Sequence, residues 1–231
     1  MTGRGDKVAQ PNATFSGSEV RREIPVDSPN ALSHADGTQR RWGASPEDWH
    51  HFSDTLGLTS DLLPVVSNQL AVTSPMSSLK GLGKTPSRYN ADRQVVGFSR
   101  WTERIANAAD VEAWSKEPDY GICIQTRRCR GIDIDIEDQG KALEVAFSLI
   151  RFFEMSAAQL SVRFRASSGR LLIPIEVKSA SRKSIIKTPH GVIEFLADGQ
   201  QFIAAGTHSS GDRYEWTKLE ELLDLRLGLL Q

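Results

Sequence analysis

The sequence predicts an α+β fold, a class in which strands and helices do not alternate regularly. Short apolar or alternating runs that are typical of strands occur at uneven intervals, and segments with helical spacing lie between them. No repeated strand–helix unit of the kind that builds a parallel sheet is present. The 231 residues, of which 39% are hydrophobic and 25% charged, have the composition of a globular protein.

The first folded element is predicted after a long polar stretch. Residues 1–44 contain many Ser, Asn, Gly, Asp and Arg residues and no apolar periodicity, so we expect a flexible N-terminal tail. A helix is predicted from Ser45, whose hydroxyl can cap it, because Pro46 suits the first turn and two acids follow near the positive end of the helix dipole. Gly57 is predicted to end this helix.

From about residue 60, strand-like runs are separated irregularly by further helices. A short helix is predicted from Asp110, and the strongest helical pattern, at 141–155, places its large apolar residues on one face. The last helix is predicted to begin at Thr217, which fits a capping box with Glu220. Strands are predicted at 63–66, 120–125, 130–136, 161–165, 171–177, 192–197 and 201–205.

Charge and composition exclude several classes of protein. The chain has 28 Lys and Arg against 29 Asp and Glu, so it is not polybasic overall, although a local basic groove is compatible with this balance. No apolar run approaches the roughly 20 residues of a membrane span, and no hydrophobic signal segment follows the N-terminus. The two cysteines cannot build a disulfide framework or a four-cysteine zinc site. We therefore expect a cytoplasmic protein without a membrane partner.

The most specific motif is the run from Gly131 to Ile136, in which isoleucine and aspartate alternate. In a strand this pattern directs Asp133 and Asp135 to one face, about 6–7 Å apart at the backbone, so that both can reach a pair of divalent cations. The exposed face of an edge strand is the alternative, although aspartate is unfavourable in strands. A third carboxylate is expected from Glu194, in another apolar strand, although this residue is equally compatible with a lone solvent-facing glutamate.

A basic segment follows the acidic strand. Residues 151–190 contain eight Lys or Arg residues and only two acids, a net charge of +6, which a solvated face would also explain. Arg163 and Arg165 alternate along a predicted strand and share a face, and Ser168 and Arg170 lie in the turn that follows. Guanidinium groups and turn amides bind triphosphate oxygens directionally. A set of surface arginines is the alternative interpretation.

In this order, the motifs of residues 60–217 resemble the bifunctional DNA primase/polymerase (prim-pol) domains of phages, plasmids and integrated elements, within the archaeo-eukaryotic primase superfamily. The resemblance depends on the acidic strand 131–135, the arginine segment 163–170 and the run 191–202 that continues to 206–216. It implies an archaeo-eukaryotic primase-like fold, with an RRM-like catalytic sheet flanked by helices and a smaller α/β subdomain. The implied domains are a tail (1–44), a prim-pol catalytic domain (45–217) and a C-terminal helix (218–231) that leads to a helicase or other module.

The resemblance also assigns roles to individual residues. Many relatives carry a histidine in the middle motif, where this chain has Leu171, so the chain is similar to an arginine-rich variant of that motif. The implied catalytic and metal-binding residues are Asp133, Asp135 and Glu194, holding two Mg²⁺ or Mn²⁺ ions. The implied nucleotide-binding residues are Arg163, Arg165, Ser168, Arg170 and His208, and the DNA-binding residues expected from the basic stretches are Lys84, Arg182, Lys183 and Lys187.

The implied function is template-dependent nucleotidyl transfer in DNA replication, either making primers or extending DNA. Its partners would be a single-stranded DNA template, NTPs or dNTPs and a replicative helicase. The chain itself would act in a bacterial host and be encoded by a phage or mobile element. Two alternatives are a two-metal nuclease, which uses the same carboxylates without needing the arginines, and a non-catalytic or weakened DNA-binding module that recruits a replicative helicase.

Overall fold

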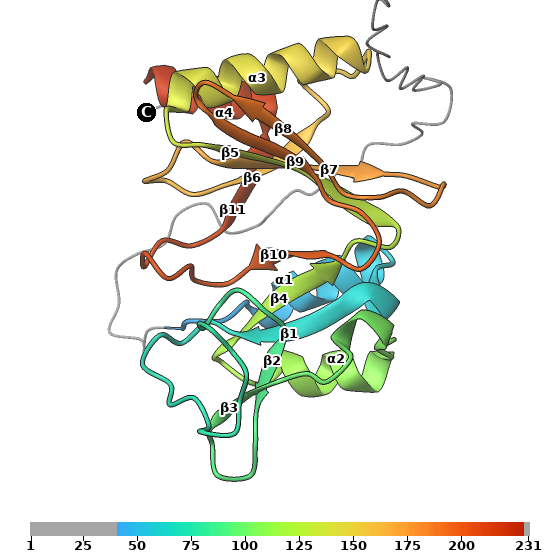
Figure 1. Cartoon of the computed structure of the whole chain (residues 1–231), viewed down its shortest axis with the longest axis vertical. Helices are drawn as coiled ribbons and strands as arrows, with labels where there is room; N and C mark the ends of the chain where they lie inside the picture. Colours follow the sequence, from blue (N-terminus) through green and yellow to red (C-terminus); the bar gives the residue numbers. More distant parts are fainter. Residues whose placement is uncertain (1–40, 229–231) are drawn as a thin grey trace, which may run out of the picture.

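The computed structural model describes residues 41–228 and agrees with the α+β class. In Figure 1, a six-stranded sheet lies above a three-stranded sheet, and two helices cover the upper face of the larger sheet. The strands pair antiparallel in both sheets. The larger sheet has the order β11 (Glu215–Lys218), β6 (Ser161–Phe164), β7 (Leu171–Glu176), β5 (Cys129–Ile136), β9 (Gly191–Phe195) and β8 (Ser184–Thr188).

The isoleucines of β5 build the upper core. Ile132, Ile134 and Ile136 are at most 1% exposed and pack with the inner faces of the two covering helices. Each such side chain stabilises the fold by about 1.5–3 kcal/mol on burial. Because side chains alternate along a strand, this packing directs the intervening residues of β5 to the opposite face of the sheet. The covering helices are α3 (Gln139–Phe152) and α4 (Leu219–Leu227).

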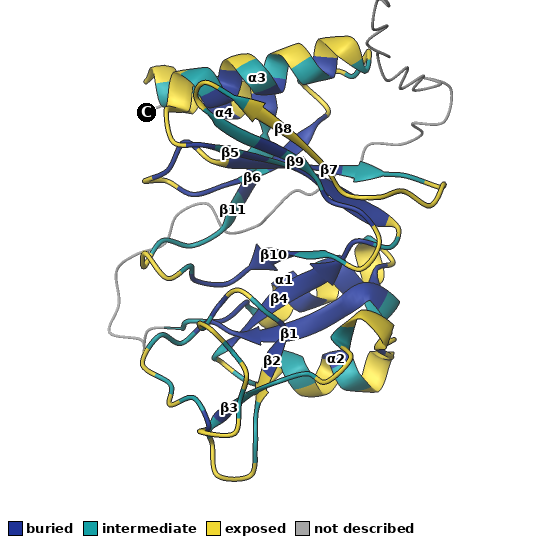
Figure 2. Cartoon of the chain, in the orientation of Figure 1, coloured by how far each residue is buried: buried dark blue, intermediate teal, exposed yellow. Residues whose placement is uncertain are grey.

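The lower layer consists of a smaller sheet with its own helices and hairpin. The edge strand β10 lies nearest to the larger sheet. The central strands of both sheets are largely buried, whereas the edge strand β8 and the outer face of α3 are exposed (Figure 2). The sheet order is β1 (Leu62–Val66), β4 (Tyr120–Gln125) and β10 (Gln201–Ala205), and the other elements are α1 (Pro46–His50), a π-helical turn (His51–Thr55), α2 (Ala108–Ser115) and the hairpin of β2 (Ser87–Tyr89) and β3 (Val95–Gly97).

The predicted start of the first helix is confirmed. Ser45 caps α1, and its hydroxyl accepts a hydrogen bond from the backbone N–H of Asp48, whose carboxylate accepts from the Ser45 N–H. The predicted tail lies mostly outside the described residues, but its last part is ordered. The backbone N–H groups of Gly43 and Ala44 bond to carbonyls near the start of β4.

The seven predicted strands lie within two residues of the observed bounds, but four strands were not predicted. These are β2, β3, β8 and β11, which are short or lie at a sheet edge, so their conformation depends on pairing with neighbours more than on local pattern. The predicted capping acid of the last helix is wrong, because Glu221 rather than Glu220 accepts the Lys218 N–H. Among the described helices, none is long and apolar enough to cross a lipid bilayer.

Candidate active site

Antiparallel pairing places three of the predicted functional residues in one row across the six-stranded sheet. Asp133 of β5 lies directly opposite Glu194 of β9. On its other side Asp133 is paired with Leu172 of β7, which in turn is paired with Arg163 of β6. Paired residues in an antiparallel sheet point to the same face, with Cβ atoms of neighbours about 4.5–5.5 Å apart. The row therefore holds a carboxylate pair with a guanidinium two strands away.

Asp135 lies on the same face, two residues along β5 from Asp133. This face is turned away from α3 and α4 and toward β10 (Figure 1). Leu172, which shares the face, accordingly packs in the core of the lower layer. Asp133, Asp135 and Glu194, which come from two separate strands, are thus neighbours on the inner face of the sheet. We call these three acids the carboxylate row.

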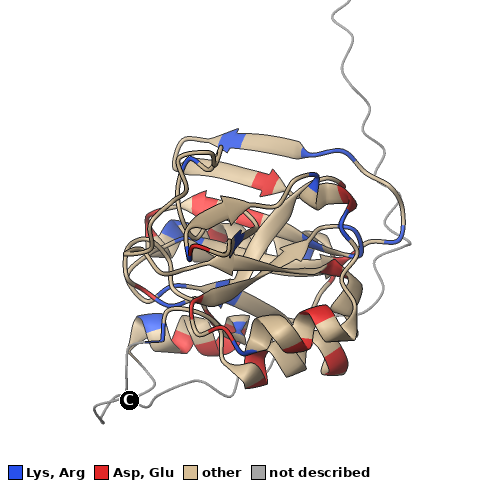
Figure 3. Cartoon of the chain, turned by 90° about the horizontal axis from the view of Figure 1, so that it is seen from below, with Lys and Arg blue, Asp and Glu red and all other residues tan. Residues whose placement is uncertain are grey.

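Each of these carboxylates lies beside one basic side chain. Figure 3 shows acidic and basic positions on neighbouring strands of the sheet. Among residues 41–228, no three potential metal ligands are close enough together to hold an ion in the arrangement observed. The three ion pairs are Arg163 Nη2–Asp133 Oδ1 at 3.8 Å, Arg170 Nε–Asp135 Oδ1 at 2.7 Å and Lys183 Nζ–Glu194 Oε2 at 2.7 Å.

Burial raises the pKa of Asp133 above its ordinary value. The Arg163 guanidinium opposes this change, whereas the neighbouring charges of Asp135 and Glu194 add to it. Like charges held close together disfavour the ionised form of each group. An additional cation beside Asp133 would therefore be bound favourably.

Arg163 is held in place beside the acids by contacts with the lower layer. Its Nη1 donates a 2.5 Å hydrogen bond to the carbonyl of Ile203 on β10, and its guanidinium carbon lies 4.7 Å from the centre of the Tyr214 ring. Only 13% of the side chain is exposed. A guanidinium fixed in this way presents its remaining N–H donors in a defined direction.

A second polar cluster surrounds Arg165, which is 9% exposed. Its Nη1 lies 2.9 Å from His208 Nδ1, and its Nη2 donates to Ser168 Oγ at 3.2 Å. Because arginine is always a donor, His208 accepts through Nδ1 and carries its proton on Nε2. Burial and the adjacent Arg165 charge lower the pKa of His208 to about 4, so the ring is neutral near pH 7.

The lowered pKa of His208 predicts a pH-dependent stability. The unfolded chain takes up a proton on this ring near pH 6.5, whereas the folded chain does so only near pH 4. The free energy of unfolding should therefore fall as the pH is lowered from about 7 toward 4. Chemical denaturation across this range should show a smaller fall for His208→Asn. An identical pH dependence in the variant and the wild type would contradict this assignment.

Gly169 allows the turn between β6 and β7 to pass close to the end of β5. A Cβ atom at this position would clash with the backbone carbonyl of Glu137. We expect Gly169→Ala to displace the turn and to lower the free energy of unfolding by about 1–3 kcal/mol, as measured by chemical denaturation. Gly81→Ala is the control, because no heavy atom lies within 4 Å of the added methyl group. Equal free energies of unfolding for the two variants would show that the turn can shift to accommodate the methyl group without a loss of stability.

Two residues of the site, Glu137 and Tyr214, were not predicted from the sequence, and a third, Lys183, was predicted to bind DNA and not to contact one of the acids. Glu137 lies between the end of β5 and Asp138, which caps α3. Glu137 binds Arg170 Nε at 2.8 Å and accepts from Ser168 Oγ at 3.2 Å, joining the turn to β5. The other two residues are Tyr214, which supports Arg163, and Lys183, which pairs with Glu194. The one sequence signal that could have identified Glu137 is its position, because it is a third acid directly after the alternating isoleucine and aspartate residues of β5.

The four residues predicted to bind DNA occupy two separate places. The carbonyl of Lys84 accepts a 2.6 Å hydrogen bond from Gln201 of β10, and the Lys84 charge contributes to lowering the pKa of His208. Arg182 and Lys187 are exposed at the β8 edge of the sheet. Lys183 also lies at this edge, although its ammonium is directed to Glu194. DNA binding by these residues remains a prediction.

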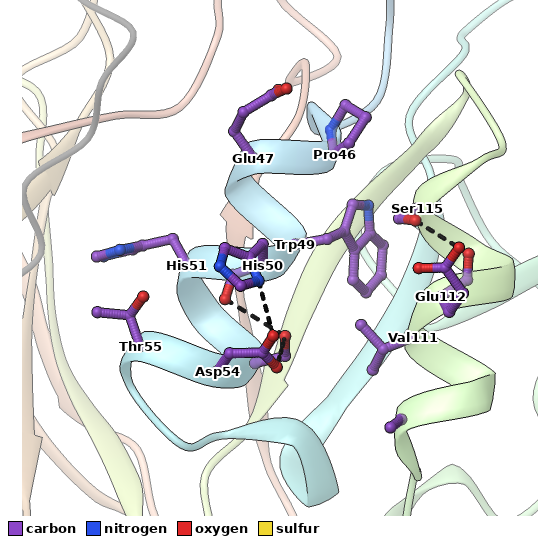
Figure 4. A pocket seen from close by; sticks show the side chains of 12 residues that line it. Pro46, Glu47, Trp49, His50, His51, Asp54, Thr55, Val111, Glu112 and Ser115 are labelled. Atoms are coloured by element: carbon purple, nitrogen blue, oxygen red, sulfur yellow. Dashed lines mark hydrogen bonds and ion pairs between the residues drawn. The ribbon is translucent and has the colours of Figure 1, made fainter.

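A separate pocket of 720 Å³ lies between α1, the π-helical turn and α2 (Figure 4). Trp49 and Val111 line it together with acidic and histidine side chains, including the His50–Asp54 pair at 2.7 Å. None of the predicted site residues contributes to its wall. Trp49 and Val111 belong to the core of the lower layer, so we assign the pocket no part in the chemistry of the carboxylate row.

A protein-family model matches residues 62–225, which is more than half of the chain. The matching model is Prim-Pol, described as the N-terminal domain of bifunctional DNA primase/polymerases. Comparisons with curated proteins and with solved structures gave no match. The matched range includes the whole carboxylate row and the arginine cluster.

Proposed function

Because the chain belongs to the Prim-Pol family of bifunctional DNA primase/polymerase N-terminal domains, we propose that it is a template-dependent nucleotidyltransferase of DNA replication, which makes primers, extends DNA, or does both. The observation that carries this proposal is the register that sets Asp133 opposite Glu194, with Arg163 in the same row. Carboxylates beside a fixed guanidinium suit the transfer of a nucleotide from a triphosphate. The larger sheet, covered by helices on one face, supports an archaeo-eukaryotic primase-like arrangement.

We propose that Asp133, Asp135 and Glu194 hold two Mg²⁺ or Mn²⁺ ions. Carboxylate oxygens are ligands that both ions prefer, and burial of Asp133 among like charges favours a cation beside it. When bound, such ions stabilise charge on the phosphates and lower the pKa of the attacking 3′-hydroxyl. To hold them, the carboxylates must exchange their present basic partners for the ions.

The basic side chains are proposed to bind the substrate phosphates. Arg163 is fixed beside the acids, and the Arg165 cluster with Ser168 and His208 lies at the adjoining turn. Charge-assisted hydrogen bonds from these groups would neutralise and orient a triphosphate. Arg170, released from Asp135, would add a further guanidinium. The exposed basic residues at the β8 edge are proposed to bind the DNA backbone in a salt-dependent manner.

The direct test of this function is nucleotide incorporation by the purified chain. A single-stranded template, labelled nucleotides and Mn²⁺ are supplied with and without a primer, and products are separated by length. We expect labelled products that require the template. Products formed without a primer would show primer synthesis, and products formed only with a primer would show extension alone.

Two results would overturn the proposal and identify its replacement. Release of short products from DNA in the absence of nucleotides would indicate a two-metal nuclease. Binding of single-stranded DNA without any metal-dependent incorporation would indicate a non-catalytic module, and recruitment of a replicative helicase would then be the function to test.

A further inference from the structure

Lys183 is the one basic partner of the carboxylate row that lies outside the strands and the β6–β7 turn. It is in the connection between β7 and β8, directly before β8 begins. Its Nζ lies 2.7 Å from Glu194 Oε2, and the two side chains are 34% and 27% exposed. The ammonium therefore occupies a carboxylate oxygen that the proposed function assigns to a divalent cation.

The connection that carries Lys183 is anchored by a buried arginine. Arg130 is 3% exposed, and its Nη2 donates to the carbonyl of Ser179 at 3.0 Å and to Asp198 Oδ1 at 2.9 Å. Its Nη1 also donates to Ser181 Oγ, two residues before the lysine. The backbone is thus fixed close to Lys183, while the four-carbon side chain keeps its own freedom to move.

The other two basic partners are held by additional contacts. Arg163 is fixed by the Ile203 carbonyl and the Tyr214 ring, and Arg170 also binds Glu137. Within residues 41–228, Glu194 is the one ion-pair partner of Lys183. The lysine is therefore the cation of this site that can be displaced with the smallest loss of other contacts.

We propose that Lys183 is a counter-ion that occupies Glu194 in the metal-free chain, competes with a divalent cation for that carboxylate, and, once displaced, donates to a phosphate oxygen of the bound nucleotide. The inference depends on the proposed function, because it requires Glu194 to be a metal ligand. Two cations that share one carboxylate repel each other, so the ammonium opposes metal binding. A nucleotide phosphate that attracts the ammonium removes this opposition, and the binding of metal and nucleotide is coupled through Lys183.

The test measures the binding of Mn²⁺ and the binding of nucleotide separately. Binding of Mn²⁺ without nucleotide is followed by the electron paramagnetic resonance signal of the free ion. We expect Lys183→Met to lower the Kd for Mn²⁺ by about three- to tenfold, and to raise the KM for nucleotide at saturating Mn²⁺. If Lys183 had only a structural role, its replacement would weaken the binding of Mn²⁺ and of nucleotide alike. Tighter Mn²⁺ binding together with a higher KM for nucleotide therefore identifies the counter-ion. Lys183→Arg, which retains the charge, should remain close to wild type in both measurements.

Lys80→Met is the control for Mn²⁺ binding, because Lys80 is exposed in the connection between β1 and β2 and, in the part of the chain that the structure describes, forms no ion pair. Its Kd for Mn²⁺ should remain within about twofold of wild type. If Glu194→Gln weakens Mn²⁺ binding but Lys183→Met does not strengthen it, the counter-ion role is wrong and the metal site stands. If the wild type binds no Mn²⁺, or if Glu194→Gln leaves its affinity unchanged, the metal site itself fails and the inference fails with it. Should Lys183→Met not fold, Lys183→Gln provides the same removal of charge.

Discussion

Asp133→Asn is expected to lower the rate of template-dependent incorporation by about 10³-fold or more, because a metal ligand in such a site contributes several kcal/mol to stabilising the transition state. The amide has the shape of the carboxylate but lacks its charge. Primer extension at saturating nucleotide measures the rate, and fluorescence anisotropy with labelled single-stranded DNA should show that DNA binding is retained.

Loss of folding cannot explain this expected result. Burial and the neighbouring acids raise the pKa of Asp133, so folding disfavours the ionised form of this carboxyl relative to the unfolded chain. The neutral amide should therefore leave the free energy of unfolding unchanged or increase it. Asp92→Asn, at an exposed position between β2 and β3, makes the same chemical change away from the row and should incorporate nucleotides at the wild-type rate. Extension at the wild-type rate by Asp133→Asn would refute the role of this carboxylate.

Arg163→Gln is expected to raise the KM for nucleotide by about 10- to 100-fold, since a hydrogen bond to a charged group contributes about 1.5–3 kcal/mol. Glutamine can still donate to the Ile203 carbonyl but carries no charge for a phosphate. The expected effect on DNA affinity is small, because Arg163 is largely buried beneath the sheet and not at its exposed edge. Steady-state kinetics with varied nucleotide and constant template and primer measure the change.

Arg151→Gln provides the matched control, because Arg151 is exposed near the end of α3, on the opposite side of the sheet. It should show wild-type kinetics. A change in DNA affinity with an unaltered KM for nucleotide in Arg163→Gln would contradict the phosphate role and would place this arginine in the DNA-binding surface.

Much of the carboxylate row could be predicted because the sequence pattern of β5 admits one arrangement. Ile132 and Ile134 are buried under α3, so a period of two leaves Asp133 and Asp135 together on the other face. Glu194 was predicted for a similar reason, since it is an acid between apolar residues of a strand. Local pattern was sufficient wherever one face of a strand is firmly buried.

The partners of these acids could not be predicted, because they depend on register and on long-range contacts. Pairing of β9 with β5 sets Glu194 opposite Asp133 rather than Asp135, and a shift by two residues would preserve the same sequence pattern. Lys183 reaches Glu194 through a connection anchored by distant side chains. The strand β8 that follows this connection lies at the edge of the sheet, where pairing with β9 determines its conformation.

The most direct measurement is anomalous scattering from crystals of the chain soaked with Mn²⁺ and a non-hydrolysable nucleoside triphosphate. We expect two Mn²⁺ peaks within coordination distance of oxygens from Asp133, Asp135 and Glu194, with the triphosphate against Arg163. Peaks at another place, or three acids still paired with their basic neighbours while the nucleotide is bound, would contradict this expectation.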